Sequence, residues 1–168
     1  MNISQVMALA PMTPAQAAQF VRYYELLAEW NAKFNLTAIT DEAGVLARHF
    51  ADSLSVLPAV PASAKTLLDV GTGAGFPGIP IAVFRPGCRV TLIESVHKKA
   101  VFLLESTRGW ANVRVIARRA EEVEERFDLI VARAVAPRDI IRLVPGLAPA
   151  VGLLTGEGDS RNLLKRNK

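Results

Sequence analysis

DVGTGAGFPG, at residues 69–78, is the most informative stretch of this sequence. It follows a short apolar run at 66–70 and leads into a segment with helical spacing at 77–84. In parallel α/β sheets, ligands bind outside the carboxyl ends of the strands, where such a turn lies. Its glycines permit positive φ and let backbone N–H groups approach a ligand closely. The stretch therefore predicts a ligand-binding loop between a strand and a helix.

Alternating strands and helices continue after this loop. Further apolar runs occur at 89–93, 113–117 and 127–132, with a weaker one at 147–155. Helical segments lie between them at 96–108, 120–125 and 139–144. This alternation is typical of a parallel sheet covered on both faces, with right-handed crossovers. We expect an α/β, Rossmann-like sheet of strand order 3-2-1-4-5.

The region before the loop has a different, all-helical texture. The first dozen residues show no periodicity, and we expect them to fray. Thr13 and Gln16 have the spacing of a capping box at the start of a helix. A second helix is expected over 41–57. We therefore predict an N-terminal helical cap over 1–62 and a ligand-binding unit over 63–168.

Composition limits the class of protein. The 168 residues carry a net charge of +4, and the single cysteine, Cys88, excludes an internal disulfide or a CxxC metal site. No segment approaches the roughly 20 apolar residues of a membrane span, and no secretory signal is visible. We expect a cytoplasmic protein without membrane contact or metal. Arginine, which is 14 of the 20 basic residues, permits a phosphate-bearing partner.

The glycines can be interpreted in more than one frame. Gly73, Gly75 and Gly78 form G-x-G-x-x-G, which would suggest a dinucleotide site. In that motif the first glycine makes the turn that leaves the strand, but here this turn falls at Gly71. The frame that starts at Gly71 has Phe76 in place of the third glycine. A loop that only turns the chain is the remaining alternative.

Several motifs, in order along the chain, carry a family resemblance. The pattern Asp69-x-Gly71-x-Gly73-x-Gly75 resembles motif I of the S-adenosylmethionine-dependent methyltransferases. The whole set resembles the RsmG (GidB) family, which methylates N7 of a guanine in bacterial 16S ribosomal RNA. The motifs that carry this resemblance are NLT at 35–37, RHF at 48–50, DSL at 52–54, LLDVGTGAGFPGIP at 67–80, the stretch 106–122 and ARAVA at 132–136.

The resemblance implies a cofactor, S-adenosyl-L-methionine, and a partner, 16S ribosomal RNA or the 30S subunit. It also implies roles at matching positions. Gly71 and Phe76 would contact the cofactor from the loop, and Glu94, Ser95 and Val96 would bracket its ribose. Ala120 and Glu121 would border its adenine, and Arg133 would lie beside the reacting centre. The alternatives are a non-catalytic nucleotide- or RNA-binding protein and a small NAD-dependent oxidoreductase.

The implied chemistry suits a chain without an obvious catalytic triad. Guanine N7 has a lone pair and no proton to lose, so placement against the methyl group can supply most of the rate. His49 lies three residues before Asp52, a spacing found more often in helix-surface or core-capping pairs than in catalytic dyads. His97 has no neighbouring histidine or thiolate, which argues against a metal site.

The C-terminal segment departs from the family. The tail at 156–168 is polar, glycine-rich and too short for two further strands, and Thr155-Gly156 replaces the family's lysine-glycine pair. We therefore expect a sheet that lacks its last strands and has 147–155 as its edge. Apolar residues on an exposed edge promote association. The sequence predicts self-association through this edge and slow turnover, and it leaves the oligomeric state open.

Overall fold

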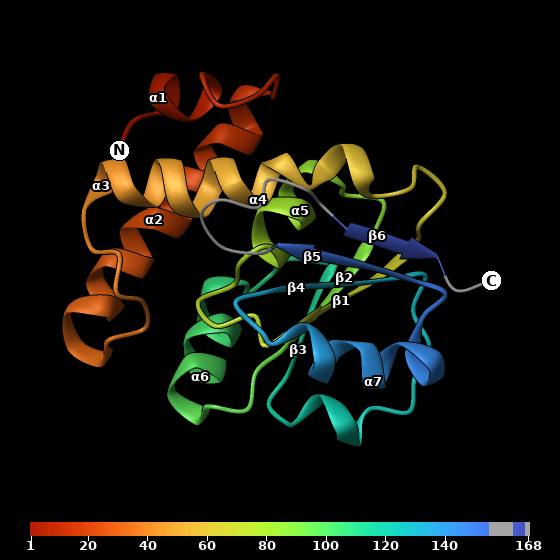
Figure 1. Cartoon of the computed structure of the whole chain (residues 1–168). Helices are drawn as coiled ribbons and strands as arrows, with labels where there is room; N and C mark the ends of the chain where they lie inside the picture. Colours follow the sequence, from red (N-terminus) through yellow and green to blue (C-terminus); the bar gives the residue numbers. More distant parts are fainter. Residues whose placement is uncertain (155–162, 167–168) are drawn as a thin grey trace.

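The computed structural model describes residues 1–154 and 163–166 (Figure 1). A six-stranded sheet of order β3-β2-β1-β4-β5-β6 forms its centre. The first five strands are parallel to one another, which confirms the α/β Rossmann-like class and the order 3-2-1-4-5. The strands are β1 Thr66–Val70, β2 Arg89–Ile93, β3 Val113–Ile116, β4 Leu129–Arg133, β5 Ala150–Leu154 and β6 Leu163–Arg166.

Helices occupy the N-terminal region and the crossovers. Within the described ranges, none is long and apolar enough to cross a bilayer. In chain order they are α1 Ile3–Met7, α2 Pro14–Phe34, α3 Glu42–Gly44, the π-helix η1 Val45–Ala51, α4 Asp52–Ser55, the 3-10 turn η2 Leu57–Ala59, α5 Gly78–Phe84, α6 His97–Ser106, the 3-10 turn η3 Ala120–Glu122 and α7 Pro137–Leu147.

Successive strand residues point to opposite sides of the sheet, so the continuous apolar runs of the strands make both of its faces apolar. Leu67 packs in the core shared with α2, α5 and α6, whereas Leu68 packs in the core under α7. Figure 1 shows α7 on the side of the sheet away from α2 and α5. On the first face, the rings of Phe20 and Phe50 meet edge to face, 4.7 Å apart. The N-terminal helices thus cover the sheet with their own apolar residues.

The N-terminal segment is better ordered than its sequence suggests. The Thr13–Gln16 capping box is present, as predicted. The expectation that the first dozen residues fray is wrong, since α1 forms there and buries Val6 completely. Its anchor is tertiary: the Met1 ammonium and the Gln5 amide both bind the carboxylate of Glu42. The division of the chain at residue 62 stays a prediction.

The C-terminal edge differs from the expectation. β6 pairs antiparallel with β5, from Ala150 opposite Arg166 to Leu153 opposite Leu163. The prediction that the fifth strand forms the edge of the sheet is therefore wrong. Backbone pairing depends on strand direction and register, and the polar composition of the tail did not reveal it. The expected self-association through β5 loses its physical basis, and Thr155-Gly156 lies outside the described residues.

Close packing around Gly78 gives a test of this fold. A Cβ at Gly78 would lie 2.3 Å from the Leu92 Cδ2 atom and 2.6 Å from the Asp69 Oδ2 atom, and both side chains are fully buried. Gly78→Ala is expected to lower the free energy of unfolding by about 1–3 kcal/mol, measured by urea denaturation. Gly87→Ala is the control, because no atom lies within 4 Å of its Cβ position. An equal effect of both substitutions would contradict the packing.

Candidate functional site

The glycine loop between β1 and α5 is a compact turn closed by its own backbone. The amides of Gly75 and Phe76 both donate to the Thr72 carbonyl at 2.9 Å. Gly71 and Gly73 have φ values of 64° and 62°, which favour glycine. A Cβ at Gly71 would also meet Val135 Cγ2 at 3.0 Å, whereas the nearest atom to a Cβ at Gly73 is 4.0 Å away. The loop is therefore crowded at its first glycine and open above its second.

Asp69, the acidic residue of β1, holds the loop through hydrogen bonds. Its Oδ2 atom accepts the Thr72 hydroxyl at 2.6 Å and the Gly78 amide at 2.7 Å, so it joins both ends of the turn. The carboxyl group is fully buried, and its Oδ1 atom has no hydrogen-bond partner within the described residues. Burial raises the pKa of Asp69 to about 7, against the opposing effects of these two bonds and of the Arg133 charge.

Tyr23 of α2 supports the back of the loop. Its hydroxyl donates to the Ala74 carbonyl, and a Cβ at Gly75 would lie 2.6 Å from the Tyr23 hydroxyl oxygen. Burial raises the pKa of Tyr23 well above its usual value. Tyr23 is buried in the core, and its polar contact was not predicted from the sequence. The only signal was a hydroxyl within an otherwise apolar helical stripe.

Glu94 follows β2 directly and lies against the loop. Its Oε2 atom accepts the Gly73 amide at 2.9 Å, and its Oε1 atom accepts the Val96 amide at 2.7 Å. The side chain is buried, whereas the following Ser95 and Val96 are exposed. A carboxylate has about four lone-pair sites, so each oxygen keeps capacity for a ligand hydroxyl.

Ala120 and Glu121 lie at the same edge of the sheet, in η3 beyond β3. The parallel register that pairs Ile93 with Ile116 brings the ends of β2 and β3 together. Ala120 is buried in the core under α7, and Glu121 is exposed. No hydrogen bond within the described part of the chain links either residue to the glycine loop. The structure thus places them near the site without joining them to it.

Arg133 is the point where the helical cap meets this edge. Its Nη1 atom donates to the Arg48 carbonyl at 2.7 Å, and its Nη2 atom lies 2.8 Å from His49 Nδ1. The guanidinium carbon is 5.3 Å from the centre of the Phe76 ring, on which the His49 ring stacks at 4.3 Å. The helix-surface or core-capping pairing of His49 with Asp52, favoured from the spacing, is not found.

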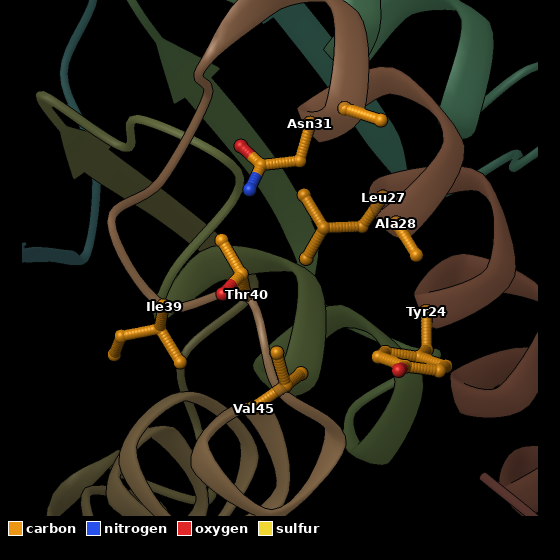
Figure 2. A pocket seen from close by; sticks show the side chains of 8 residues that line it. Tyr24, Leu27, Ala28, Asn31, Ile39, Thr40 and Val45 are labelled. Atoms are coloured by element: carbon orange, nitrogen blue, oxygen red, sulfur yellow. The ribbon is translucent and has the colours of Figure 1, made fainter.

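A separate cavity of about 200 Å³ lies between α2 and the segment that leads into η1. Figure 2 shows the side chains around it. None of the predicted cofactor-binding residues lines this cavity, so it is distinct from the site at the sheet edge. In the residues that the structure describes, no group of three or more His, Cys, Asp or Glu side chains is placed to hold a metal ion. The cavity is lined by Tyr24, Leu27, Ala28, Asn31, Ala32, Ile39, Thr40 and Val45.

Solved structures share this architecture at low sequence identity. Coclaurine N-methyltransferase, bound to N-methylheliamine and SAH, matches 90% of this chain and 57% of its own, with a TM-score of 0.55 and 16% identity. P. horikoshii TYW2 in complex with MeSAdo matches 62% of this chain and 42% of its own, with a TM-score of 0.52 and 17% identity. This likeness is one of fold: a Rossmann-like sheet with helices on both faces.

Sequence comparison defines the family. The GidB model, described as rRNA small subunit methyltransferase G, matches residues 16–144. "Ribosomal RNA small subunit methyltransferase G" of Pelotomaculum thermopropionicum is 47% identical over 84% of this chain and 62% of its own length. Its namesake from Roseiflexus sp. is 46% identical over 72% of this chain and 55% of its own length. The chain belongs to the GidB family, and it spans little more than half the length of these relatives.

The buried carboxyl group predicts a pH-dependent stability. Because the pKa of Asp69 is raised from 3.8 to about 7, the native state binds more protons than the unfolded chain between these values. The contribution of Asp69 to stability is present below its unfolded pKa and is lost as the pH rises through about 7. Urea denaturation should therefore show wild type losing stability relative to Asp69→Asn between about pH 4 and pH 7.

Asp128→Asn is the control of opposite sign. Hydrogen bonds from the Lys65 and Thr66 amides lower the pKa of Asp128, so its contribution is present above the ordinary pKa and is lost in acid. If the difference in the free energy of unfolding between wild type and Asp69→Asn does not change with pH, Asp69 does not have a raised pKa.

Proposed function

We propose that this protein transfers a methyl group from S-adenosyl-L-methionine to N7 of a guanine in bacterial 16S ribosomal RNA, in the cytoplasm. The observation that carries the proposal is the bond between the Gly73 amide and Glu94, in a chain of the GidB family. It joins the turn after β1 to the acid after β2. The likeness to relatives named for small-subunit ribosomal RNA supports the RNA, free or within the 30S subunit, as the partner.

The residues at the sheet edge fit this cofactor. The space above Gly73 leaves room for a ligand close to the backbone, and Glu94 keeps lone pairs for ribose hydroxyls. Beneath the loop, the Asp69 Oδ1 atom has no hydrogen-bond partner within the described residues. We assign Gly71 and Phe76 to cofactor contact from the loop. Ser95 and Val96 are assigned to the ribose, and Ala120 and Glu121 to the adenine.

This reaction requires the protein to place guanine N7 against the methyl group, and it requires no proton transfer. When bound, the cofactor supplies an activated methyl group on a sulfonium. Guanine N7 has no proton to lose, so no general base is required. The described site agrees: Asp69 and Tyr23 are buried and bonded to the loop, and His49 is engaged by its neighbours. Orientation of the two reactants can then supply most of the rate.

Arg133 is assigned to an anion beside the reacting centre. Two of its five N–H groups are used by Arg48 and His49. The other three have no hydrogen-bond partner within the described residues. A cation next to a sulfonium is useful only if it binds a negative group. The two candidates are the carboxylate of the cofactor and a phosphate of the RNA.

Cofactor choice is tested by calorimetric titration with S-adenosylhomocysteine and with NAD. We expect the first to bind and the second not to bind. Gly71→Val should abolish binding, because a branched side chain is strained at a φ of 64° and collides with Val135. Gly87→Val, at an open position, is the control and should bind like wild type. Binding of NAD without S-adenosylhomocysteine would overturn the proposal.

The RNA partner is tested by the salt dependence of binding to 16S ribosomal RNA. Phosphate contacts make affinity fall steeply as salt rises. If Arg133 binds a phosphate, Arg133→Ala should reduce the slope by about 1 and leave cofactor affinity unchanged. If Arg133 binds the cofactor, only cofactor affinity should fall. A flat salt response of the wild type would contradict RNA as the partner, and RNA binding without methyl transfer would favour a non-catalytic protein.

A further inference from the structure

His49 lies at the junction between the cap and the sheet edge, with both ring nitrogens engaged. The side chain is buried at 4% exposure. Its Nδ1 atom is 2.8 Å from Arg133 Nη2, and its Nε2 atom is 2.9 Å from Thr37 Oγ1. Its ring stacks on Phe76 with an angle of 15° between the planes. The two polar contacts and the stacked ring of Phe76 therefore restrict the imidazole.

The chemistry of Arg133 fixes the tautomer of this ring. A guanidinium has N–H donors and no acceptor, so Nδ1 of His49 must accept the bond from Arg133. The single ring proton is then on Nε2, which donates to the Thr37 hydroxyl oxygen. Burial lowers the pKa of His49 to about 4, and the Arg133 charge acts in the same direction. The ring is neutral at physiological pH.

Thr37 is itself held in place by α2. The side-chain amide of Asn31 brackets its backbone: the Thr37 amide donates to Asn31 Oδ1 at 2.8 Å, and Asn31 Nδ2 donates to the Thr37 carbonyl at 3.1 Å. The Thr37 hydroxyl oxygen also accepts the Ile39 amide at 3.2 Å. A continuous chain of hydrogen bonds thus runs from Asn31 through Thr37 and His49 to Arg133.

The π-helix η1 supplies the second acceptor for Arg133. In an α-helix the Asp52 amide would bond to the carbonyl four residues earlier, at Arg48. Here it bonds to the carbonyls of Ala47 and His49. The Arg48 carbonyl is therefore available to Arg133 Nη1 at 2.7 Å. The irregular helix presents two adjacent acceptors, one from the backbone and one from the imidazole, to one guanidinium.

We propose that His49 is a positioning residue for the methyl-transfer site: its Nδ1 acceptor, set by Thr37, orients the Arg133 guanidinium toward the bound anion. This inference rests on the proposed function and deepens it. With two N–H groups held by adjacent acceptors, the plane of the guanidinium is fixed, and so are the directions of its remaining donors. Loss of the imidazole acceptor leaves a single bond, about which the group can rotate.

Protonation of His49 would also undo the arrangement, because an imidazolium has no acceptor for Arg133. The charged groups around the pair are Arg48 beside the histidine, with Asp52 and Asp69 acting on Arg133. Tyr23 also acts on the pKa of Arg133. Since the pKa of His49 is about 4, the arrangement is expected to persist from neutral pH down to about pH 5.

The functional test compares two replacements of the ring. His49→Phe keeps a stacked ring without an acceptor, whereas His49→Asn offers an amide oxygen near the Nδ1 position. We expect His49→Phe to lower the affinity that Arg133 serves, or kcat, by roughly tenfold to a hundredfold. His49→Asn should restore part of it. Thr37→Val should show a smaller loss of the same kind, and Thr40→Val, at an exposed site nearby, should show none.

A double-mutant cycle separates positioning from a general structural role. If His49 acts through Arg133, His49→Phe should add no more than about twofold to the defect of Arg133→Ala. Fully additive losses would overturn the proposal, as would an unaltered His49→Phe protein. Melting temperatures of each variant show whether a loss comes from unfolding.

A second readout does not depend on turnover. Nitrogen-15 NMR of the His49 ring in the unliganded protein should show the neutral tautomer with the proton on Nε2 at pH 7. In Arg133→Ala its pKa should rise, because the positive charge that opposes protonation is gone. A proton on Nδ1, or an unchanged pKa, would overturn the proposal. If the wild type transfers no methyl group, the proposed function fails, and the NMR result still decides the positioning of Arg133.

Discussion

The buried carboxyl group of Asp69 holds the two ends of the glycine loop together, and the site depends on it. One oxygen receives the Thr72 hydroxyl at the start of the turn and the Gly78 amide at the start of α5. Glu94 and Tyr23 hold the middle of the same loop, at the Gly73 amide and the Ala74 carbonyl. A loop of small residues with little side-chain packing of its own thereby gains one defined shape. Burial of the unpaired carboxyl oxygen costs stability, and the two hydrogen bonds offset only part of that cost, since the pKa of Asp69 is still raised.

The N-terminal helices are part of the site and not only a cover for the sheet. α2 contributes Tyr23 behind the loop, and η1 contributes the acceptors that hold Arg133. The ring of Phe76 lies between these contributions, stacked against His49 and close to the guanidinium. We therefore expect a movement of either the cap or the sheet edge to break the hydrogen bonds of this junction.

The sequence predicted the features that depend on local pattern. β1 and β2 lie at the predicted residues, and the order of the first five strands is correct. The helix expected at 120–125 is only the 3-10 turn η3. The family resemblance singled out Glu94, and the parallel pairing of β1 with β2 accounts for its approach to the loop. The anchoring of α1 and the bond between His49 and Arg133 were missed because each joins residues far apart in sequence. The pairing of β6 was missed because the tail is polar in composition. The i→i+5 bonds of η1 were missed because no residue at 45–51 breaks an ordinary helical pattern.

A crystal structure of this chain with S-adenosylhomocysteine would test the central claim most directly. The account predicts the ligand over Gly71 and Gly73, with its ribose hydroxyls on Glu94 and the loop bonds of Asp69 unchanged. It also predicts that Arg133 keeps its bonds to Arg48 and His49. Ligand in the cavity beside Tyr24 and Leu27, or a loop rearranged so that Asp69 releases Thr72 and Gly78, would contradict it.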